Sequence, residues 1–325
     1  MSFFEEVNGY SLGGYQYLNH RRKTGPIRLC MAIQVKDEAD IIELNIRYHA
    51  KKGCEAFFVV DNGSTDGTRE ILQSLKSEYY ITIIDDSTPD HNQSANMSML
   101  SHLARKKGFD WVIENDADEF WYPNSGSLLS GLNRHDAVLR VKRVNALPLK
   151  SEPDNWINSP WHTLNTLNFD MEANYEQGEN NFLLAPVLHK VMVNPFGLIG
   201  VSGGNHGARH VADKVRGRKF TKWNDNLKIF HFALRSYERF ERKVENINSS
   251  LKYTSSNSYK KHNFGRHAIY WNEAYEKGEL HKVYEEMLLD EAHIECMKKL
   301  ALIEFDDSFL KDNSQLTSAF GQSSN

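Results

Sequence analysis

The chain has 325 residues, of which 40% are hydrophobic and 25% are charged, and its formal net charge at pH 7 is -4. These values are typical of a globular protein with a substantial core. Because the net charge is slightly negative, the chain has no overall attraction to nucleic acid, and we expect no nucleic-acid partner.

Apolar segments alternate with helical patterns through the first half of the chain. The predicted strands are residues 27–35, 56–60, 80–84 and 111–113, and a helix follows each of the first three. Asp40 is the expected N-cap of the first helix, and the third helix spans residues 93–107. This alternation predicts an α/β fold with a mostly parallel central sheet flanked by helices, in which the loops after the strands meet at one edge.

The second half of the chain has a different pattern. Strands are predicted at residues 137–141, 182–193 and 227–232, and residues 145–178 have the composition of a long loop. Helices are predicted at residues 237–248 and 280–303. The end of the chain, rich in Ser, Gln and Asn over residues 312–325, is predicted to be disordered.

An acidic run follows the fourth predicted strand. Asp116 and Asp118 are two positions apart, so in an extended segment their side chains point to the same side. Two carboxylates this close repel each other unless a cation lies between them, and Mn²⁺ or Mg²⁺ suits both these ligands and phosphate oxygens. The pattern favours a metal-diphosphate site. The alternative is a solvated acidic loop in which Asp118 or Glu119 caps a helix.

A second polar turn, residues 61–67, directly follows the second predicted strand. Asp61 stands at the strand end, where its carboxylate can accept a hydrogen bond from a base or a ribose hydroxyl. Two glycines allow a tight turn. Together with the Asp-x-Asp pair, this turn predicts a nucleoside site beside the metal. The alternative is an ordinary turn in which Thr65 or Asp66 caps the next helix.

Four motifs follow one another in the first half of the chain: residues 35–39, residues 59–66, the helix that begins near Asn96, and residues 116–120. Together they resemble the motifs of inverting family 2 glycosyltransferases, in the branch with the metal motif Asp-Ala-Asp-Glu-Phe. The resemblance implies a GT-A-type fold that binds a nucleotide-diphospho-sugar and carries a C-terminal helical extension.

The resemblance also implies roles for single residues. Glu38 and Asp61 would contact uracil and ribose, and Asp118 would bind the metal. Asp116 would contact the ribose or a metal-bound water. The full set of nucleotide-binding candidates is Lys36, Glu38, Asp61, Asp66, Asn96 and Asp116.

Later segments extend the resemblance. Residues 190–195, 203–206 and 229–236 are similar to late motifs of the same branch. His206 and His231 are therefore candidates for a third metal ligand or for a donor to phosphate, and the alternative for each is a packed ring bonded to backbone. The candidate metal ligands are Asp116, Asp118, His206 and His231. A basic stretch at residues 214–222 would neutralise a diphosphate, or it is a solvated face.

The catalytic base is the part of the family pattern that this chain lacks. Many family 2 enzymes carry the base in a Glu-Asp dipeptide, which occurs nowhere in this sequence. Glu152 and Asp154 are weak substitutes, and Asp170 and Glu172 are others. The sequence therefore leaves the catalytic base unknown.

The expected function is metal-dependent, inverting transfer of a sugar from a nucleotide sugar, UDP-linked, to a hydroxyl of a carbohydrate or glycolipid acceptor. Surface polysaccharide or glycan synthesis is the expected setting. One alternative is a nucleotidyltransferase that makes a nucleotide sugar, although the acidic residues 36–40 offer no glycine-rich grip for a triphosphate. The other is a non-catalytic protein of the same fold that binds nucleotide or carbohydrate.

The expected organisation is one main domain with additions. Residues 1–25 form an N-terminal lead, 26–145 the nucleotide-sugar-binding half, 146–235 the acceptor-side half, 236–310 a helical extension and 311–325 a tail. With no apolar run near ~20 residues, no signal-peptide layout and scattered cysteines, we expect a cytoplasmic protein. Peripheral contact at the inner face of the membrane and the oligomeric state remain open.

Overall fold

The structure is a computed structural model that describes residues 3–86, 92–165, 182–185, 187–214, 221–253 and 266–321. The chain divides into two compact units. The first unit is Met1–Arg143 with Leu188–Ile229, and the second is Val144–Val187 with Phe230–Asn325. This division differs from the predicted one, because residues 146–235 do not form one half: their first part joins the C-terminal helices and their later part joins the central sheet.

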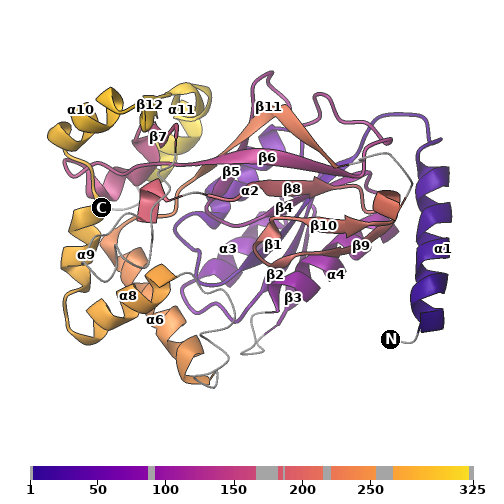
Figure 1. The fold of residues 1–325 in the computed structure, drawn as a ribbon, viewed down its shortest axis with the longest axis horizontal. Helices are drawn as coiled ribbons and strands as arrows, with labels where there is room; N and C mark the ends of the chain where they lie inside the picture. Colours follow the sequence, from indigo (N-terminus) through magenta and orange to yellow (C-terminus); the bar gives the residue numbers. More distant parts are fainter. Residues whose placement is uncertain are drawn as a thin grey trace. The chain divides into compact units, whose positions relative to one another are not determined.

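The central sheet has eight strands in the order β3-β2-β1-β4-β8-β6-β11-β5 (Figure 1). Its parallel part consists of β1 (Leu29–Val35), β2 (Ala56–Asp61), β3 (Ile81–Asp85) and β4 (Trp111–Asn115). The remaining strands are β5 (Glu119–Pro123), β6 (Val138–Asn145), β8 (Lys190–Val193) and β11 (Thr221–His231). β8 pairs antiparallel with both β4 and β6. The predicted α/β fold is confirmed.

The register of the parallel strands brings their carboxyl ends together. Val35 pairs with Asp61, and Asp61 pairs with Asp85 on the next strand. On the other side of β1, Ile33 pairs with Asn115 at the end of β4. The loops after β1, β2 and β4 therefore leave the sheet at the same edge, which is where such sheets bind ligands.

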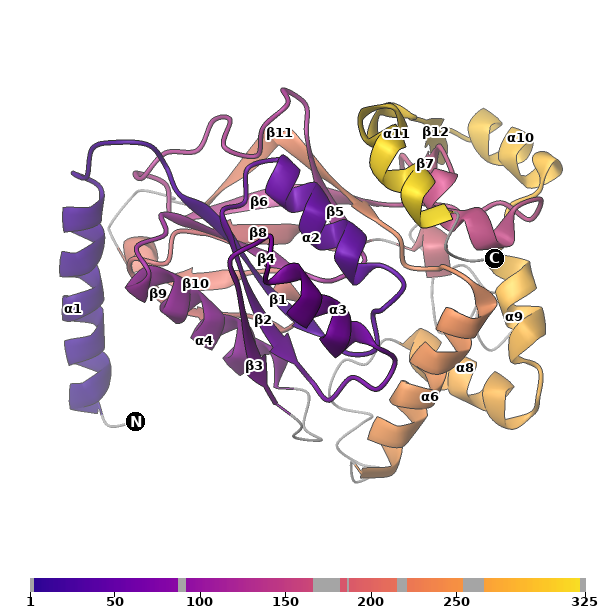
Figure 2. The ribbon, with the colours of Figure 1, turned by 180° about the vertical axis from the view of Figure 1, so that it is seen from behind.

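Helices flank the parallel strands (Figure 2). They are α2 (Ile42–Lys51), α3 (Thr68–Leu75) and α4 (Gln93–Lys106). Side chains that alternate along β1 and β2, such as Cys30, Ala32 and Phe58, form one core with Met97 of α4. Asp40 is not the N-cap of α2, contrary to the prediction. Instead, the backbone carbonyl of Glu38 accepts the first amide hydrogens, so no side-chain cap is needed.

The N-terminal lead is a helix, α1 (Phe3–His20), within the first unit. Tyr17 donates its hydroxyl hydrogen to the carbonyl of His135, and its ring meets that of His210 edge to face. His210 belongs to β10 (Ala208–His210), which pairs with β9 (Leu198–Val201), and both views show α1 beside this hairpin (Figures 1 and 2). The buried Tyr17 explains why these residues form a packed helix.

The second unit contains short strands and helices around its own apolar cluster. Its elements are η1 (Pro153–Asn158), β7 (Trp161–Thr163), η2 (Phe182–Leu184), α6 (Tyr237–Tyr253), α8 (Arg266–Glu276), α9 (Leu280–Met287), α10 (Glu291–Lys299), β12 (Ile303–Phe305) and α11 (Ser308–Gly321). β7 pairs with β12, which ties the segment after Val144 to the C-terminal helices. Phe240, Trp271 and Val283 lie in the shared cluster.

Two predictions for the C-terminal region are wrong. The helix predicted at residues 280–303 is two helices, because Leu288 is extended and Asp290 caps α10 by accepting the amide hydrogen of His293. The tail predicted to be disordered is helical as far as Gly321. Phe309 and Asn313 are both buried, and this burial anchors α11.

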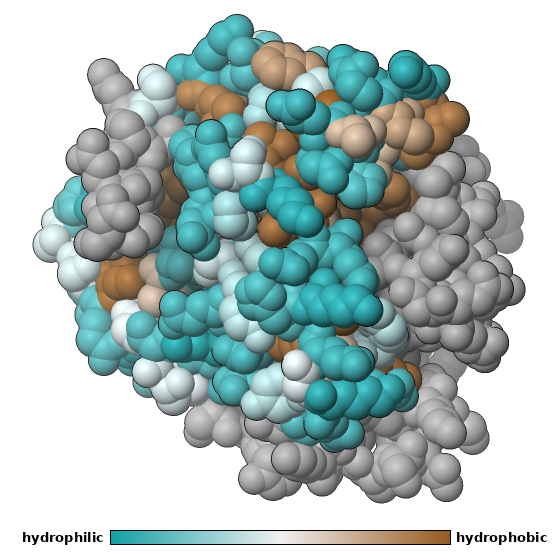
Figure 3. Space-filling model, turned by 90° about the vertical axis from the view of Figure 1, so that its left-hand side faces the viewer, coloured by the Kyte–Doolittle hydropathy of each residue, from teal (hydrophilic) through white to brown (hydrophobic). Residues whose placement is uncertain are grey.

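The described helices do not combine the length and hydropathy that a bilayer crossing requires. On the face drawn in Figure 3, hydrophilic residues prevail and apolar residues form small separate patches.

Candidate functional site

The loop after β1 and the turn after β2 are joined by hydrogen bonds. The Asp37 amide donates to Ser64 Oγ at 3.0 Å, and the Thr65 amide donates to Asp37 Oδ1 at 2.7 Å. These bonds stabilise Asp37 at φ 51, a left-handed conformation that is uncommon outside glycine. Lys36 Nζ donates to the carbonyls of Asn62 and Gly63 at 3.1 and 3.2 Å. These hydrogen bonds join the loops after β1 and β2 into one continuous polar surface at the sheet edge, which we call the polar ledge.

Asp66 holds this ledge to α3. Its Oδ2 accepts the Ala39 amide at 3.0 Å, and its Oδ1 accepts the Thr68 amide at 3.1 Å in the first turn of α3. The Glu38 amide donates to Thr68 Oγ1 at 2.7 Å. Asp66 thus has a structural role in the turn, although the N-cap residue of α3 is Gly67, and its contact with a nucleotide remains a prediction.

Asp61 and Asn96 occupy neighbouring positions along the same edge. Asp61 is 5% exposed, and its Oδ1 accepts the Ser64 amide at 2.9 Å. Asn96 lies on α4 and donates to Asp86 Oδ2 at 2.8 Å and to Gln34 Oε1 at 3.3 Å. Asn96 therefore connects the carboxyl ends of β1 and β3, and a nucleotide contact for either residue remains a prediction.

Asp116 begins the turn between β4 and β5, where three side chains donate to it. Its Oδ1 accepts hydrogen bonds from Gln93 at 3.1 Å and from Asn205 at 3.0 Å. Its Oδ2 forms an ion pair with Lys190, the first residue of β8. Lys190 is 1% exposed and also contacts Glu119 Oε1 at 3.3 Å. The Asp116 carboxylate is thus held by a cation that belongs to the protein.

Lys190 remains protonated in this position. Burial lowers the pKa of a lysine, but the adjacent carboxylates of Asp116 and Glu119 outweigh it and hold the pKa of Lys190 above its usual value. Lys190 therefore stays an ammonium ion at neutral pH. Arg143 adds a second cation to Glu119, with Nη1 2.7 Å from Oε1.

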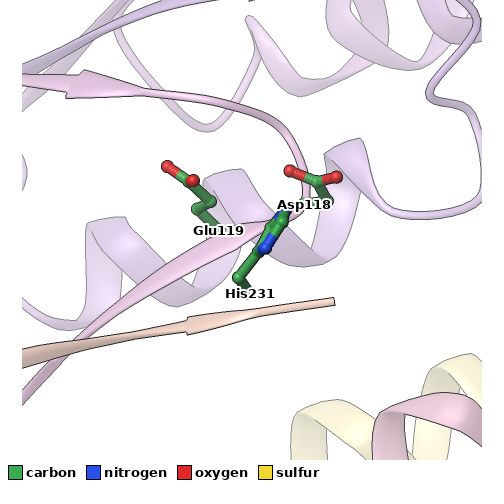
Figure 4. Close-up of side chains that lie close together, drawn as sticks. All are labelled: Asp118, Glu119 and His231. Atoms are coloured by element: carbon green, nitrogen blue, oxygen red, sulfur yellow. The ribbon is translucent and has the colours of Figure 1, made fainter. Parts of the chain in front are cut away.

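Asp118, Glu119 and His231 form a group that could hold a metal ion. One ligand atom of each lies within 4.8 Å of the others. Asp118 lies in the β4–β5 turn, Glu119 begins β5, and His231 ends β11 (Figure 4). His231 Nδ1 is bonded to Asn145 Oδ1 at 2.7 Å, which orients the ring.

A buried polar atom in this group supports a bound cation. Glu119 Oε2 is buried and has no hydrogen-bond partner among the residues that the structure describes. A buried carboxylate oxygen without a partner is costly, and coordination to a divalent ion would satisfy it. Carboxylate oxygens with one imidazole nitrogen suit Mn²⁺ or Mg²⁺.

The four predicted metal ligands therefore fall into two places. Asp118 and His231 belong to the group with Glu119, which the sequence did not single out as a ligand. Asp116 lies with Lys190, and His206 bonds through Nδ1 to the His189 carbonyl at 2.8 Å. Burial, with the nearby positive charge of Lys190, lowers the pKa of His206 to about 4. The signal for Glu119 was present: it is a carboxylate at the start of an otherwise apolar strand.

The candidate bases lie in the second unit. Glu152 and Asp154 are both exposed, and Glu152 Oε2 accepts a hydrogen bond from Asn155 at 2.8 Å. Asp170 and Glu172 are outside the described residues, as are residues 215–220 of the basic stretch. Lys222, from the same stretch, pairs with Asp136 at 2.5 Å. A role in catalysis for Glu152 or Asp154 remains a prediction.

Parts of this chain are similar to known sequences. The model of glycosyl transferase family 2 matches residues 55–191. A glycosyltransferase family 92 protein of Oryza sativa subsp. japonica is 24% identical over 181 residues, which are 55% of this chain and 29% of that protein. A family 92 protein of Arabidopsis thaliana is 32% identical over 94 residues, 29% of this chain and 16% of that protein. The chain spans less than a third of the length of these relatives.

Among solved structures, S. aureus TarS 1-349 in complex with UDP-GlcNAc is similar at a TM-score of 0.38 and 10% identity, covering 80% of this chain and 90% of that one. Glucosyl-3-phosphoglycerate synthase from Mycobacterium tuberculosis, in complex with Mn²⁺, UDP and phosphoglyceric acid, is similar at a TM-score of 0.36 and 15% identity, covering 70% and 78%. These two likenesses are remote, whereas the family model covers β2, β4 and the acidic turn directly. Residues 55–191, which include β2, β4 and the acidic turn, are therefore similar to glycosyl transferase family 2.

Proposed function

We propose that this protein is a metal-dependent glycosyltransferase that moves a sugar from a nucleotide sugar, UDP-linked, to a hydroxyl group with inversion at the anomeric carbon. The family of residues 55–191 and the names of the curated relatives support the reaction class. The acceptor that we propose is a carbohydrate or a glycolipid.

The observation that carries the proposal is the buried Glu119 Oε2 beside Asp118 in the turn after β4. Asp118, Glu119 and His231 would hold the divalent ion, Mn²⁺ or Mg²⁺. When bound, such an ion supplies positive charge that stabilises a departing nucleotide diphosphate. Because the loops after β1, β2 and β4 share one edge, a donor bound there could reach this turn.

The chain's own residues would position the nucleotide. The Asp61 carboxylate, at the end of β2, would accept a hydrogen bond from a ribose hydroxyl or a base N–H, and Glu38 is the partner proposed for uracil. The ledge formed by the loops after β1 and β2 pre-organises these groups, which reduces the entropy cost of binding. Lys36, Asp66 and Asn96 are proposed as supports or further contacts.

In this proposal, a carboxylate base would take the proton from the attacking hydroxyl. Glu152 and Asp154 are the described candidates, and Glu152→Gln and Asp154→Asn would identify a base by a loss of kcat that exceeds any change in KM.

The test is release of UDP from a panel of UDP-sugars, with and without Mn²⁺, in the presence of simple sugar acceptors. UDP release that requires both Mn²⁺ and Asp118 supports the proposal. Full activity in EDTA, or in Asp118→Ala, contradicts the metal role. Consumption of UTP with release of pyrophosphate would instead indicate a nucleotidyltransferase, and tight UDP binding without turnover of any donor would indicate a binding protein.

A further inference from the structure

The acidic turn between β4 and β5 already contains an internal cation. Lys190 Nζ lies between the carboxylates of Asp116 and Glu119, and it also donates to the carbonyl of Gly204 at 2.9 Å. All of these residues belong to the first unit. A lysine that is 1% exposed rarely occurs without several partners, because burial of its charge is costly.

Several side chains around Lys190 hold the half-buried carboxylate of Asp116. Gln93 donates to Asp116 through Nε2 and accepts the Gly204 amide through Oε1 at 2.8 Å. Asn205, at φ 58 and fully buried, donates to Asp116 from the same short turn. Lys190 therefore binds both the carboxylate and the turn that surrounds it.

The carboxylates of the acidic turn thus have different environments. Asp116 is neutralised from within the protein, whereas Asp118 and Glu119 Oε2 lie in the group suited to a divalent ion. We infer that Lys190 is a positioning residue that takes the place of a second metal ion: it confines the divalent cation to the Asp118–Glu119 side and holds Asp116 for the donor. This inference rests on the metal site of the proposed function.

Removal of the lysine charge should strengthen binding of a metal to the turn. An ion on Glu119 Oε2 would lie roughly 6 Å from Lys190 Nζ, given the 3.3 Å contact with Oε1. The Lys190 ammonium and the divalent ion repel each other at that distance. Even when screened as in water, this repulsion corresponds to about a tenfold change in the Kd of the metal ion.

The experiment is a titration of the full chain with Mn²⁺ alone, without nucleotide or acceptor. Electron paramagnetic resonance measures the concentration of free Mn²⁺ at each point of the titration. Lys190→Met should bind Mn²⁺ at least about tenfold more tightly than the wild type, or bind a second ion. Lys190→Arg, which keeps the charge, should stay close to the wild type. Lys52→Met removes another buried lysine of the first unit, whose ammonium lies over the rings of Tyr48 and Tyr122, and should leave Mn²⁺ binding unchanged.

A double variant separates the charge effect from structural damage. In Lys190→Met/Asp116→Asn both charges are removed, so Mn²⁺ affinity should return to within about threefold of the wild type. Circular dichroism would verify that each variant is folded. Unchanged Mn²⁺ affinity and stoichiometry in folded Lys190→Met would overturn the inference while leaving the proposed transferase activity intact. Conversely, a wild type that binds Mn²⁺ but turns over no donor would contradict the function and leave the role of Lys190 standing.

Discussion

Asp116 and Asp118 are equivalent in the sequence pattern but not in the structure, and a pair of isosteric substitutions should separate them. Asp118→Asn removes the charge of a carboxylate in the metal group, whereas Asp116→Asn removes one that already faces Lys190. We predict that the first substitution weakens Mn²⁺ binding far more than the second.

The magnitude follows from the distances. A ligand oxygen lies about 2.1 Å from such an ion, so loss of a unit charge there costs about 4 kcal/mol even with the screening of water. That cost is roughly a thousandfold in Kd. Asp116 is separated from the metal group by the Lys190 ammonium, and its neutralisation should weaken Mn²⁺ binding by no more than about tenfold.

The assay is titration of each variant with Mn²⁺ by isothermal calorimetry, with thermal unfolding as the check on folding. Metal-dependent release of UDP should fall in parallel for Asp118→Asn. Equal losses of affinity in the two variants would refute the reasoning, because they would mean that both carboxylates coordinate the ion. An unchanged Kd in Asp118→Asn would refute it as well.

Three further predictions concern the framework of the first unit. Gly204→Ala should destabilise the protein by about 1–3 kcal/mol in urea unfolding, because its φ is +69° and an added Cβ would lie 2.6 Å from His206 Nε2. Gly203→Ala is the matched control: an added Cβ there would have no atom within 4 Å, so its effect should be near neutral. Asp110→Asn should lower the free energy of unfolding by about 3–5 kcal/mol, since it removes the carboxylate whose Oδ2 lies 2.7 Å from the buried Arg134; an effect below 1 kcal/mol in chemical denaturation would contradict this. Burial lowers the pKa of His49 to about 3, so between pH 6.5 and pH 3 this histidine binds a proton in the unfolded chain but not in the folded one. The stability that His49 contributes is therefore present above pH 6.5 and is lost as the pH falls toward 3. The stability difference between wild type and His49→Gln should therefore shrink by about 1.4 kcal/mol per pH unit below 6.5, and a difference that does not change with pH would show that His49 does not titrate as predicted.

The sequence alone determined the parallel part of the fold and the edge that carries the site. Strands buried on both faces must be apolar along their length, so 27–35, 56–60, 80–84 and 111–113 could be recognised without a structure, and polar turns after them had to meet. Asp61, Asp116 and Asp118 were found for that reason. α1 was missed because its N-terminal segment has no strong apolar periodicity, and its packing depends on distant partners such as His135.

Only the tertiary structure decided which carboxylate meets which cation. Lys190 is 74 positions away from Asp116 in the sequence, and it reaches that side chain because β8 pairs antiparallel with β4. The two-residue spacing of Asp116 and Asp118 predicts that they act together, because it describes only the local geometry of an extended segment. Long-range pairing of strands places a buried ammonium beside one of them, and electrostatic compensation at short distance then assigns the two carboxylates to different tasks.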